Sequence, residues 1–256
     1  MGEVASHVSL AGKTALVTGG ARGIGAAISR RLAAAGCDVA ILYYSSHAAA
    51  EALCAELRAG GRRAVAEQVN VADPGSVARG VEHVLDQLGR IDMAVSNAAS
   101  GVLRPARELT LKHWRWCLET NALALNLLAN ALAPQMPRGG RLIALSSLGA
   151  ERALPDYAFV GASKAALEAL VRSLAVELGE GGITVNCVRA GVVDGEALRA
   201  FPQREALLAA FAQRAPLGPQ LTAADVAGAV YLLCLPDAAM ITGQTLVVDG
   251  GYSIAG

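Results

Sequence analysis

Short apolar segments alternate with helix-like segments along almost the whole chain. Runs of Val, Ile and Leu on consecutive positions are typical of strands that are covered on both faces. This pattern predicts strands at Thr14–Thr18, Val39–Tyr43, Ala64–Val69, Met93–Ser96, Arg141–Leu145, Thr184–Val188 and Thr245–Val248. Helical segments fall between them and include Ile24–Ala35, His47–Ala59, Ser76–Leu88, Ala158–Glu177 and Thr222–Leu235. The alternation indicates an α/β fold, a doubly wound parallel sheet with helices on both faces.

The bulk composition suits a single domain of this kind. With 256 residues, of which 54% are hydrophobic and 17% charged, the chain can bury both faces of a Rossmann-type sheet of about seven strands. It shows no linker and no internal repeat, so we expect one domain over residues 1–256. The formal net charge is zero and no basic block is present. These features argue against nucleic-acid binding and against an electrostatic membrane anchor.

The cysteine pattern and the absence of a leader predict a cytoplasmic protein. Five cysteines are scattered, and none forms a Cys-x-x-Cys pair or lies at ligand spacing beside a histidine. We therefore expect buried thiols in a reducing compartment and no metal site. No signal peptide precedes the first strand, and the apolar run Ala122–Ala133 is too short to span a bilayer.

Glycine and polar residues follow the expected strands. Doubly wound sheets bind ligands at this edge, beyond the carboxyl ends of their strands. The positions expected to line the crevice are Gly19, Gly23, Ile24 and Gly25 after the first strand, Asn70 and Val71 after the third, Asn97 and Ala98 after the fourth, Ser147 after the fifth, and Gly191 and Val193 after the sixth. Their clustering predicts a binding site there.

The turn Thr18–Gly25 joins the first strand to the first helix. Its glycines permit a tight turn, close approach of the backbone to a pyrophosphate, and close packing of helix on strand. The first N–H groups of the following helix and its positive dipole end then favour an anion. The turn therefore predicts a nicotinamide dinucleotide site.

NADPH is expected rather than NADH. A site selective for NAD usually carries an acidic residue after the second strand to hold the ribose hydroxyls. The segment Tyr43–His47 contains no carboxylate. Arg22 supplies a cation inside the glycine turn, and Ser45 and Ser46 are hydrogen-bond donors for a 2′-phosphate. His47 is interpreted as an ordinary residue of the first helical turn.

Together the glycine turn, Asn97-Ala98-Ala99, Asn121, Ser147, a Tyr/Lys pair and the closing Val248-Asp249-Gly250-Gly251 resemble the short-chain dehydrogenase/reductase family. The resemblance covers the chain from about Leu10 to its end. It implies an oxidoreductase. It also implies a homodimer or homotetramer, with interfaces formed by the helices around Trp114–Leu132 and Ala158–Leu178.

The chain departs from the common pattern of that family at one position. The pattern places a tyrosine four residues before the lysine and thirteen after the serine, but both counts, from Lys164 and from Ser147, reach Val160. The nearest tyrosine is Tyr157, in Tyr-x6-Lys spacing. That spacing resembles the enoyl-acyl-carrier-protein reductases, and the chain is most similar to their NADPH-dependent type III enzymes. An acyl thioester on acyl carrier protein or CoA is the substrate that this implies.

The displaced tyrosine also has a physical interpretation. On a helix, seven residues are close to two turns, so Tyr157 and Lys164 would share a face, with Tyr157 about 4.5 Å along the axis from position 160. In an enoyl thioester, the β-carbon that accepts hydride lies three bonds from the carbonyl oxygen, whereas a ketone carbon carries its oxygen directly. A phenol one turn farther away therefore favours reduction of a carbon–carbon double bond.

Several residues receive expected roles. Tyr157 stabilises an enolate, and Lys164 holds the nicotinamide-ribose hydroxyls and favours charge on the phenolic oxygen. Ser147 either binds the substrate oxygen or only lines the pocket. Asn121 is expected to shape its helix, and Asn97 to be a structural residue beside the cofactor.

The segment 194–214 follows the sixth strand and is expected to cover the site as a lid. It carries an apolar stripe that either receives an acyl chain or packs as an amphipathic helix. Trp114 and Trp116 are interpreted as core or interface residues, with a substrate contact as the alternative. Two alternatives stay open. One is a carbonyl reductase of the same family, and the other is a catalytically silent NADPH-binding scaffold, which the valine at position 160 in place of the family's tyrosine would explain.

Overall fold

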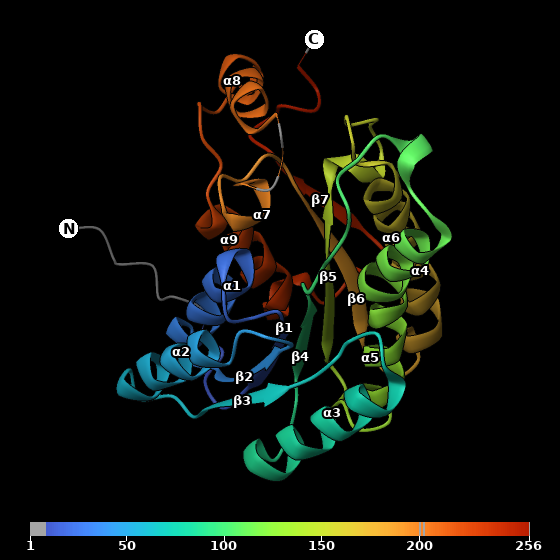
Figure 1. The fold of residues 1–256 in the computed structure, drawn as a ribbon. Coiled ribbons are helices and arrows are strands. Elements are labelled where there is room, and N and C mark those ends of the chain that lie inside the picture. The colour runs from blue at the N-terminus through green and yellow to red at the C-terminus, as the bar shows by residue number, and fades with distance from the viewer. Residues whose placement is uncertain (1–8, 200, 202, 256) are drawn as a thin grey trace, which may run out of the picture.

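Seven parallel strands form one sheet in the computed structural model, which describes residues 9–199, 201 and 203–255 (Figure 1). The strands are β1 (Thr14–Thr18), β2 (Asp38–Tyr43), β3 (Ala64–Gln68), β4 (Met93–Ser96), β5 (Arg141–Ser147), β6 (Thr184–Ala190) and β7 (Thr245–Val248). Their order is β3-β2-β1-β4-β5-β6-β7. The order reverses between β1 and β4, where doubly wound sheets bind ligands. The expected Rossmann-type fold is therefore confirmed.

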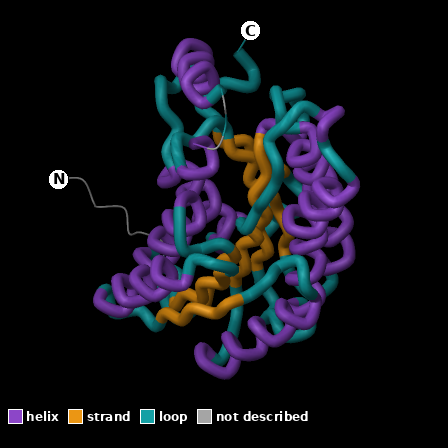
Figure 2. Tube along the Cα trace, viewed as in Figure 1, coloured by secondary structure: helices purple, strands orange, loops and turns teal. Residues whose placement is uncertain are grey.

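Helices cover both faces of the sheet (Figures 1 and 2). They are α1 (Gly23–Ala34), α2 (His47–Ala59), α3 (Pro74–Leu88), α4 (Leu111–Leu118), α5 (Ala124–Leu132), α6 (Ala158–Gly179), α7 (Glu196–Arg199), α8 (Arg204–Arg214) and α9 (Ala223–Cys234). The first core cluster joins α1, α2 and α9 to one face of the sheet, with Ile28 and Val230 at 0% exposure. The second joins α3, α5 and α6 to the other face, with Val84 and Leu125 at 0%.

Most expected elements begin and end within two residues of those observed. Thr222 caps α9 as its sequence indicates, accepting a hydrogen bond from the Asp225 N–H at 3.3 Å. The expectation that Ser147 follows the fifth strand is wrong. Pairing of β5 with β6 continues to Ser147↔Ala190, so Ser146 and Ser147 are the last residues of the strand. The pleat therefore sets the direction of their side chains.

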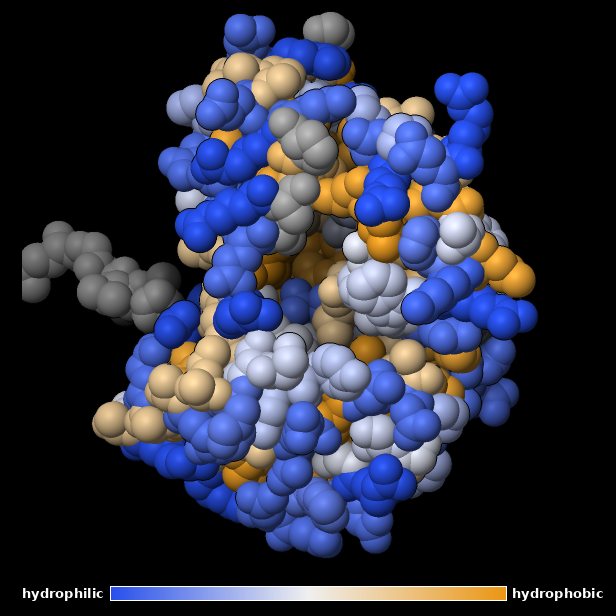
Figure 3. Space-filling view, viewed as in Figure 1, coloured by the Kyte–Doolittle hydropathy of each residue, from blue (hydrophilic) through white to orange (hydrophobic). Residues whose placement is uncertain are grey.

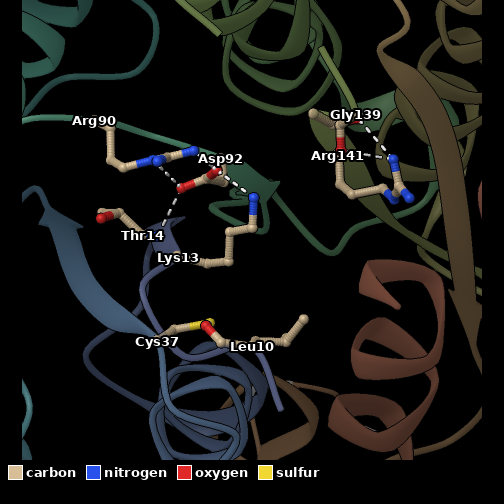
Figure 4. A network of polar contacts seen from close by, with 9 residues as sticks. Leu10, Lys13, Thr14, Cys37, Arg90, Asp92, Gly139 and Arg141 are labelled. Atoms are coloured by element: carbon tan, nitrogen blue, oxygen red, sulfur yellow. Dashed lines mark hydrogen bonds and ion pairs between the residues drawn. The ribbon is translucent and has the colours of Figure 1, made fainter. Parts of the chain in front are cut away.

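A polar network ties strands together at their amino ends, away from the expected crevice (Figure 4). Asp92, 3% exposed, accepts hydrogen bonds from the Thr14 N–H and from the Lys13 and Arg90 side chains. Burial would raise the pKa of this carboxyl, but the three donors outweigh it and hold the pKa below its ordinary value. Arg141, at the start of β5, donates to the Gly139 carbonyl oxygen at 2.7 Å.

The segment after β6 forms a separate small layer. Helices α7 and α8 stand at the carboxyl edge of the sheet in Figure 1, and Phe211 of α8 packs against Tyr252 with ring centroids 5.3 Å apart. A third apolar cluster includes these rings and Leu148. Ala200 and Pro202 of the expected lid lie outside the described residues. Among the residues described, no helix has both the length and the apolar character needed to cross a membrane.

Candidate active site

Figure 3 shows a hollow with an apolar interior on the face where the α7–α8 layer meets the body of the molecule. The glycine turn after β1 lies beside the loop that follows β4, and Thr18 holds the two together. Its Oγ1 accepts hydrogen bonds from the N–H groups of Asn97 and Ala98 at 2.9 and 3.0 Å. Asn97 Nδ2 donates in return to the carbonyl oxygens of Thr18 and Gly19 at 3.0 and 3.2 Å. Asn97 is thus part of the structure of the turn.

The backbone of the turn requires glycine at several positions. Gly19 and Gly23 have φ of 62° and 53°, in the left-handed region that favours glycine. A Cβ on Gly25 would lie 2.6 Å from Asn97 Nδ2. Glycine at position 25 therefore lets α1 pack closely on β1 and on the β4 loop.

The start of α1 fits a pyrophosphate. In the described chain, no side chain caps this helix and its first turn contains no acidic residue, so its first N–H groups are available to an anion. A Cβ on Gly23 would meet no described heavy atom within 4 Å, so the backbone there borders open space. Ile24, the next residue, is half-buried against the core. A chain of free amides beside open space is what a bound diphosphate needs.

The surroundings of the expected 2′-phosphate site are basic and polar. Arg22 is exposed and forms an ion pair with Glu196 of α7 at 3.3 Å. Ser45 is exposed, and Ser46 precedes α2 without a capping hydrogen bond from its side chain among the described residues. The Ser46 hydroxyl is therefore not used to cap α2. The His47 Nδ1 lies 2.7 Å from the Tyr43 hydroxyl, which ties the first residue of α2 to the last residue of β2.

The remaining expected cofactor residues lie at neighbouring strand ends. Asn70 is exposed and its Oδ1 accepts from the Ala72 N–H at 3.1 Å, so its side chain shapes the turn after β3, while Val71 packs against the core. The N–H of Gly191 donates to the Val248 carbonyl oxygen at 2.9 Å. Val193 forms an isolated bridge with Leu221. These contacts fix the backbone at both flanks of the crevice.

Tyr157 and Ser147 come together in space. The Tyr157 hydroxyl lies 3.1 Å from Ser147 Oγ, so either group can donate to the other. Burial raises the pKa of the Tyr157 phenol, and the hydrogen bond from Ser147 offsets this only in part. The phenol is therefore protonated at neutral pH and can donate a hydrogen bond.

Lys164 is a buried residue of α6. It is 5% exposed, and its Nζ donates to the Leu145 carbonyl oxygen at 2.7 Å. Burial lowers the pKa of its ammonium group to about 8, against the opposing effects of Cys187 and Glu168. Glu168 is itself held by Arg189 at 2.6 Å and by Ser146 at 2.6 Å. An ammonium group of low pKa thus stands close to an ion pair that fixes the end of β5.

Tyr157 precedes α6 rather than belonging to it. It is the N-cap residue, with φ of −114° and ψ of 9°, and its carbonyl oxygen accepts the first helical hydrogen bond, from the Gly161 N–H at 2.7 Å. That Tyr157 and Lys164 share a helical face stays a prediction. Asp156, with φ of 59°, is the only non-glycine residue of the described chain in the left-handed region. Its carbonyl oxygen accepts from the Arg104 N–H at 3.1 Å. This turn, which sequence periodicity does not reveal, aims the tyrosine.

Asn121 lies in a π-helical turn, Glu119–Leu123, between α4 and α5. Its amide exchanges hydrogen bonds of 2.8 Å with the backbone of Ser100 and donates to Ser163 Oγ at 2.9 Å. Asn121 therefore connects this turn to the loop after β4 and to α6. A single-turn π-bulge of this kind often occurs at functional sites.

Aromatic side chains surround the tyrosine. The Phe201 ring, from the segment between α7 and α8, lies 5.6 Å from that of Tyr157 between centroids, so the lid segment contacts the site. Trp114 packs edge-on against Phe159 at 5.1 Å. Trp114 and Trp116 are 36% and 45% exposed, so the expectation that they are core residues is wrong, and interface packing and substrate contact stay open.

Comparison with known proteins places this geometry in a family. The family model described as Enoyl-(Acyl carrier protein) reductase matches residues 19–253. The chain belongs to the short-chain dehydrogenase/reductase family and is an oxidoreductase of that family.

Two curated relatives illustrate the range of the family. The chain is 36% identical over 244 residues to 1-cyclohexenylcarbonyl-CoA reductase of Streptomyces collinus, covering 94% of this chain and 87% of the relative. It is 33% identical over 255 residues to a hydroxynaphthalene reductase-like protein of Metarhizium majus, covering 95% of this chain and 96% of that relative.

Solved structures agree with the fold and bear on the cofactor. A blue fluorescent protein from a metagenomic library, in complex with NADPH, is 41% identical with a TM-score of 0.88, covering 96% of this chain and 99% of that one. A short-chain dehydrogenase from Burkholderia cenocepacia J2315, in complex with NADP, is 38% identical with a TM-score of 0.88, covering 95% and 99%.

Proposed function

We propose that this protein is an NADPH-dependent reductase that acts on the α,β double bond of an enoyl thioester. The observation that carries the proposal is the position of the phenol. Tyr157 places its hydroxyl 3.1 Å from Ser147, while Val160, where the common family pattern has its tyrosine, is 6% exposed and has no proton to donate. The hydrogen-bond donor of the site therefore comes from the residue before α6.

NADPH fits the residues at the start of α1 and α2. The free N–H groups of α1 suit the pyrophosphate, and Arg22, Ser45 and Ser46 suit a 2′-phosphate. The neighbours bound to NADPH and NADP, at 41% and 38% identity, support this choice. When bound, NADPH supplies the hydride that the β-carbon of the substrate accepts.

Tyr157 acts on the carbonyl oxygen of the thioester. As hydride arrives at the β-carbon, the electron pair of the double bond moves toward that oxygen, and an enolate forms. The protonated phenol donates a hydrogen bond to the developing charge, an interaction that is typically worth roughly 10²–10³ in turnover. The α-carbon then takes a proton from water, which completes the saturated thioester.

Ser147 and Lys164 support the tyrosine. Ser147 fixes the direction of the phenol, because its Oγ is held at the end of β5. The buried ammonium of Lys164 favours negative charge on the phenolic oxygen and binds the ribose hydroxyls of the nicotinamide. Both residues come from elements that pack in the core, so the site is preorganised.

The S. collinus relative supports the class of substrate. It is named as a reductase of a cyclohexenylcarbonyl-CoA, which is an unsaturated CoA thioester, and the matching family model is described as an enoyl reductase on acyl carrier protein. We therefore assign an acyl thioester, on CoA or on acyl carrier protein, to the crevice. The segment 194–214, with Phe201 against Tyr157, covers the acyl part.

The second candidate is a carbonyl reductase. It rests on the M. majus relative, whose name refers to a hydroxynaphthalene rather than to a thioester. In that case a group other than Tyr157 has to protonate the ketone oxygen.

Side-by-side assays separate these functions. Purified protein is mixed with NADPH and either crotonyl-CoA or acetoacetyl-CoA, and oxidation of NADPH is followed. We expect turnover of crotonyl-CoA to butyryl-CoA. Turnover of acetoacetyl-CoA alone would support the carbonyl reductase, and NADPH binding without turnover of either would support a silent scaffold.

A further inference from the structure

Two glycines outside the cofactor turn contact the two positions that distinguish this site. Gly149 follows Ser147 in the short 3₁₀ helix Leu148–Ala150, and Gly101 lies in the loop after β4. Neither has a positive φ, so the backbone at these positions is open to any residue. The reason for glycine is therefore space.

Gly149 makes room for the ring of Tyr157. A Cβ on Gly149 would approach Tyr157 Cδ1 and Cε1 more closely than real Cβ atoms approach any neighbour. The Gly149 backbone is itself closely packed, because a Cβ on Gly161 of α6 would come within 2.6 Å of its carbonyl oxygen. A side chain at position 149 would therefore displace the ring and lengthen the 3.1 Å contact between the Tyr157 hydroxyl and Ser147.

Gly101 packs closely against the side chain of Val160. A Cβ on Gly101 would clash with Val160 Cγ2 and lie 3.4 Å from Cys117 Sγ. Val160 is 6% exposed and Cys117 is 0% exposed, so this contact is part of a closed wall. A ring at position 160 would have to push the loop after β4 outward, and β-branched Val160 has little rotamer freedom with which to yield.

We infer that Gly149 and Gly101 are specificity-determining residues, which together commit the site to the displaced tyrosine. Gly149 admits the phenol at position 157, and Gly101 closes the position from which a phenol would serve a ketone. This inference rests on the proposed function and names the residues that set its substrate class.

A double-mutant cycle tests the role of Gly149. Gly149→Ala is expected to lower kcat for crotonyl-CoA by roughly 10²–10³, the loss typical for one oxyanion donor, with the Kd for NADPH unchanged. In the Tyr157→Phe background, which keeps the ring but lacks the hydroxyl, the same substitution is expected to cause no further loss. Gly179→Ala is the matched control, because Gly179 lies at the exposed end of α6 and a Cβ there meets no described heavy atom within 4 Å.

The outcomes also separate this inference from the proposed function. An equal loss of kcat from Gly149→Ala in both backgrounds, or wild-type kcat in that variant, would overturn the role of Gly149 although crotonyl-CoA is reduced. If wild-type protein does not reduce crotonyl-CoA, the proposed function fails, and a crystal structure of Gly149→Ala still tests the inference. We expect the Ser147 Oγ to Tyr157 hydroxyl distance to exceed hydrogen-bonding range, and an unchanged distance would contradict it.

Gly101 is tested with Val160. Val160→Tyr is expected to give no gain in acetoacetyl-CoA reduction, and such a gain in the folded variant would overturn the role of Gly101. Thermal unfolding supplies a second test. Gly101→Ala is expected to lower Tm, and Gly101→Ala combined with Val160→Ala to lower it by less than the sum of the single changes, because the shorter side chain relieves the clash. Additive changes in Tm would contradict the contact.

Discussion

At the residue scale, the proposed chemistry depends on the protonation of two side chains, the phenol of Tyr157 and the ammonium group of Lys164. Tyr157 and Lys164 are both buried enough to change their pKa values, in opposite directions. The raised pKa keeps Tyr157 a donor across the neutral range. The lowered pKa brings the titration of Lys164 close to physiological pH.

Replacing Tyr157 by Phe removes the donor and keeps the ring. We expect kcat for crotonyl-CoA to fall by roughly 10²–10³, because one hydrogen bond to the enolate oxygen is lost. The Kd for NADPH, measured by fluorescence titration, is expected to stay at the wild-type value. Tyr252→Phe is the control, since that tyrosine packs on Phe211 in the α8 layer. Wild-type kcat in Tyr157→Phe would remove Tyr157 from the reaction.

The pH profile follows from Lys164. The Lys164 side chain is charged below its pKa and neutral above it. At neutral pH it is therefore charged and favours negative charge on the phenolic oxygen of Tyr157. We expect kcat/KM for crotonyl-CoA to fall as the pH rises through about 8. In Lys164→Met the residual rate is expected to lack this decline. A flat profile to pH 10 in the wild-type protein would contradict the assignment.

At the scale of elements, the glycine turn and α7 meet through Arg22 and Glu196, which form an exposed ion pair at 3.3 Å. Exposed pairs of this kind contribute little to stability. We therefore expect Arg22 to exchange Glu196 for the 2′-phosphate of NADPH, because a charge-assisted contact with a phosphate is stronger.

The Arg22→Ala variant tests that exchange. We expect its Kd for NADPH to rise about tenfold, which corresponds to about 1.4 kcal/mol. The Kd for NADH is expected to change little, because NADH has no 2′-phosphate. Isothermal titration with both cofactors measures the two values. Equal weakening of both would show that Arg22 serves the turn rather than cofactor selectivity.

The elements that the sequence predicts well are those with local signals. Apolar runs locate all seven strands, and Thr222 with Asp225 locates the start of α9. The placement of Tyr157 could not be predicted in the same way. It depends on the left-handed Asp156 and on contact with Gly149, eight residues away in sequence, and helical periodicity carries no information about either.

The candidate site residues also divide into those with a local sequence signal and those defined by contacts between distant segments. The family resemblance pointed to Lys164, Ser147 and the empty position at Val160, because its pattern consists of fixed spacings along the chain. The roles of Gly101 and Gly149 come from contacts between distant segments, and a glycine in a loop carries no local sign of what it touches. The exposure of Trp114 and Trp116 was missed for a related reason, since burial depends on how helices pack.

At the scale of the whole molecule, apolar side chains remain exposed on neighbouring helices. Trp116 of α4, Leu123 of the π-helical turn and Val176 of α6 are 45%, 40% and 80% exposed. Apolar groups gathered on adjacent elements favour association. We expect a homodimer or homotetramer by light scattering after gel filtration at micromolar concentration, and a shift toward monomer in Val176→Lys. A monomeric wild-type protein would contradict this.

The destination of the hydride tests the central claim most directly. Protein, NADPH labelled with deuterium at the transferred position, crotonyl-CoA and acetoacetyl-CoA are incubated together, and the products are analysed by mass spectrometry and NMR. We predict deuterium on the β-carbon of butyryl-CoA, with acetoacetyl-CoA left unreduced. Deuterium on the carbinol carbon of 3-hydroxybutyryl-CoA, with crotonyl-CoA left intact, would contradict the account.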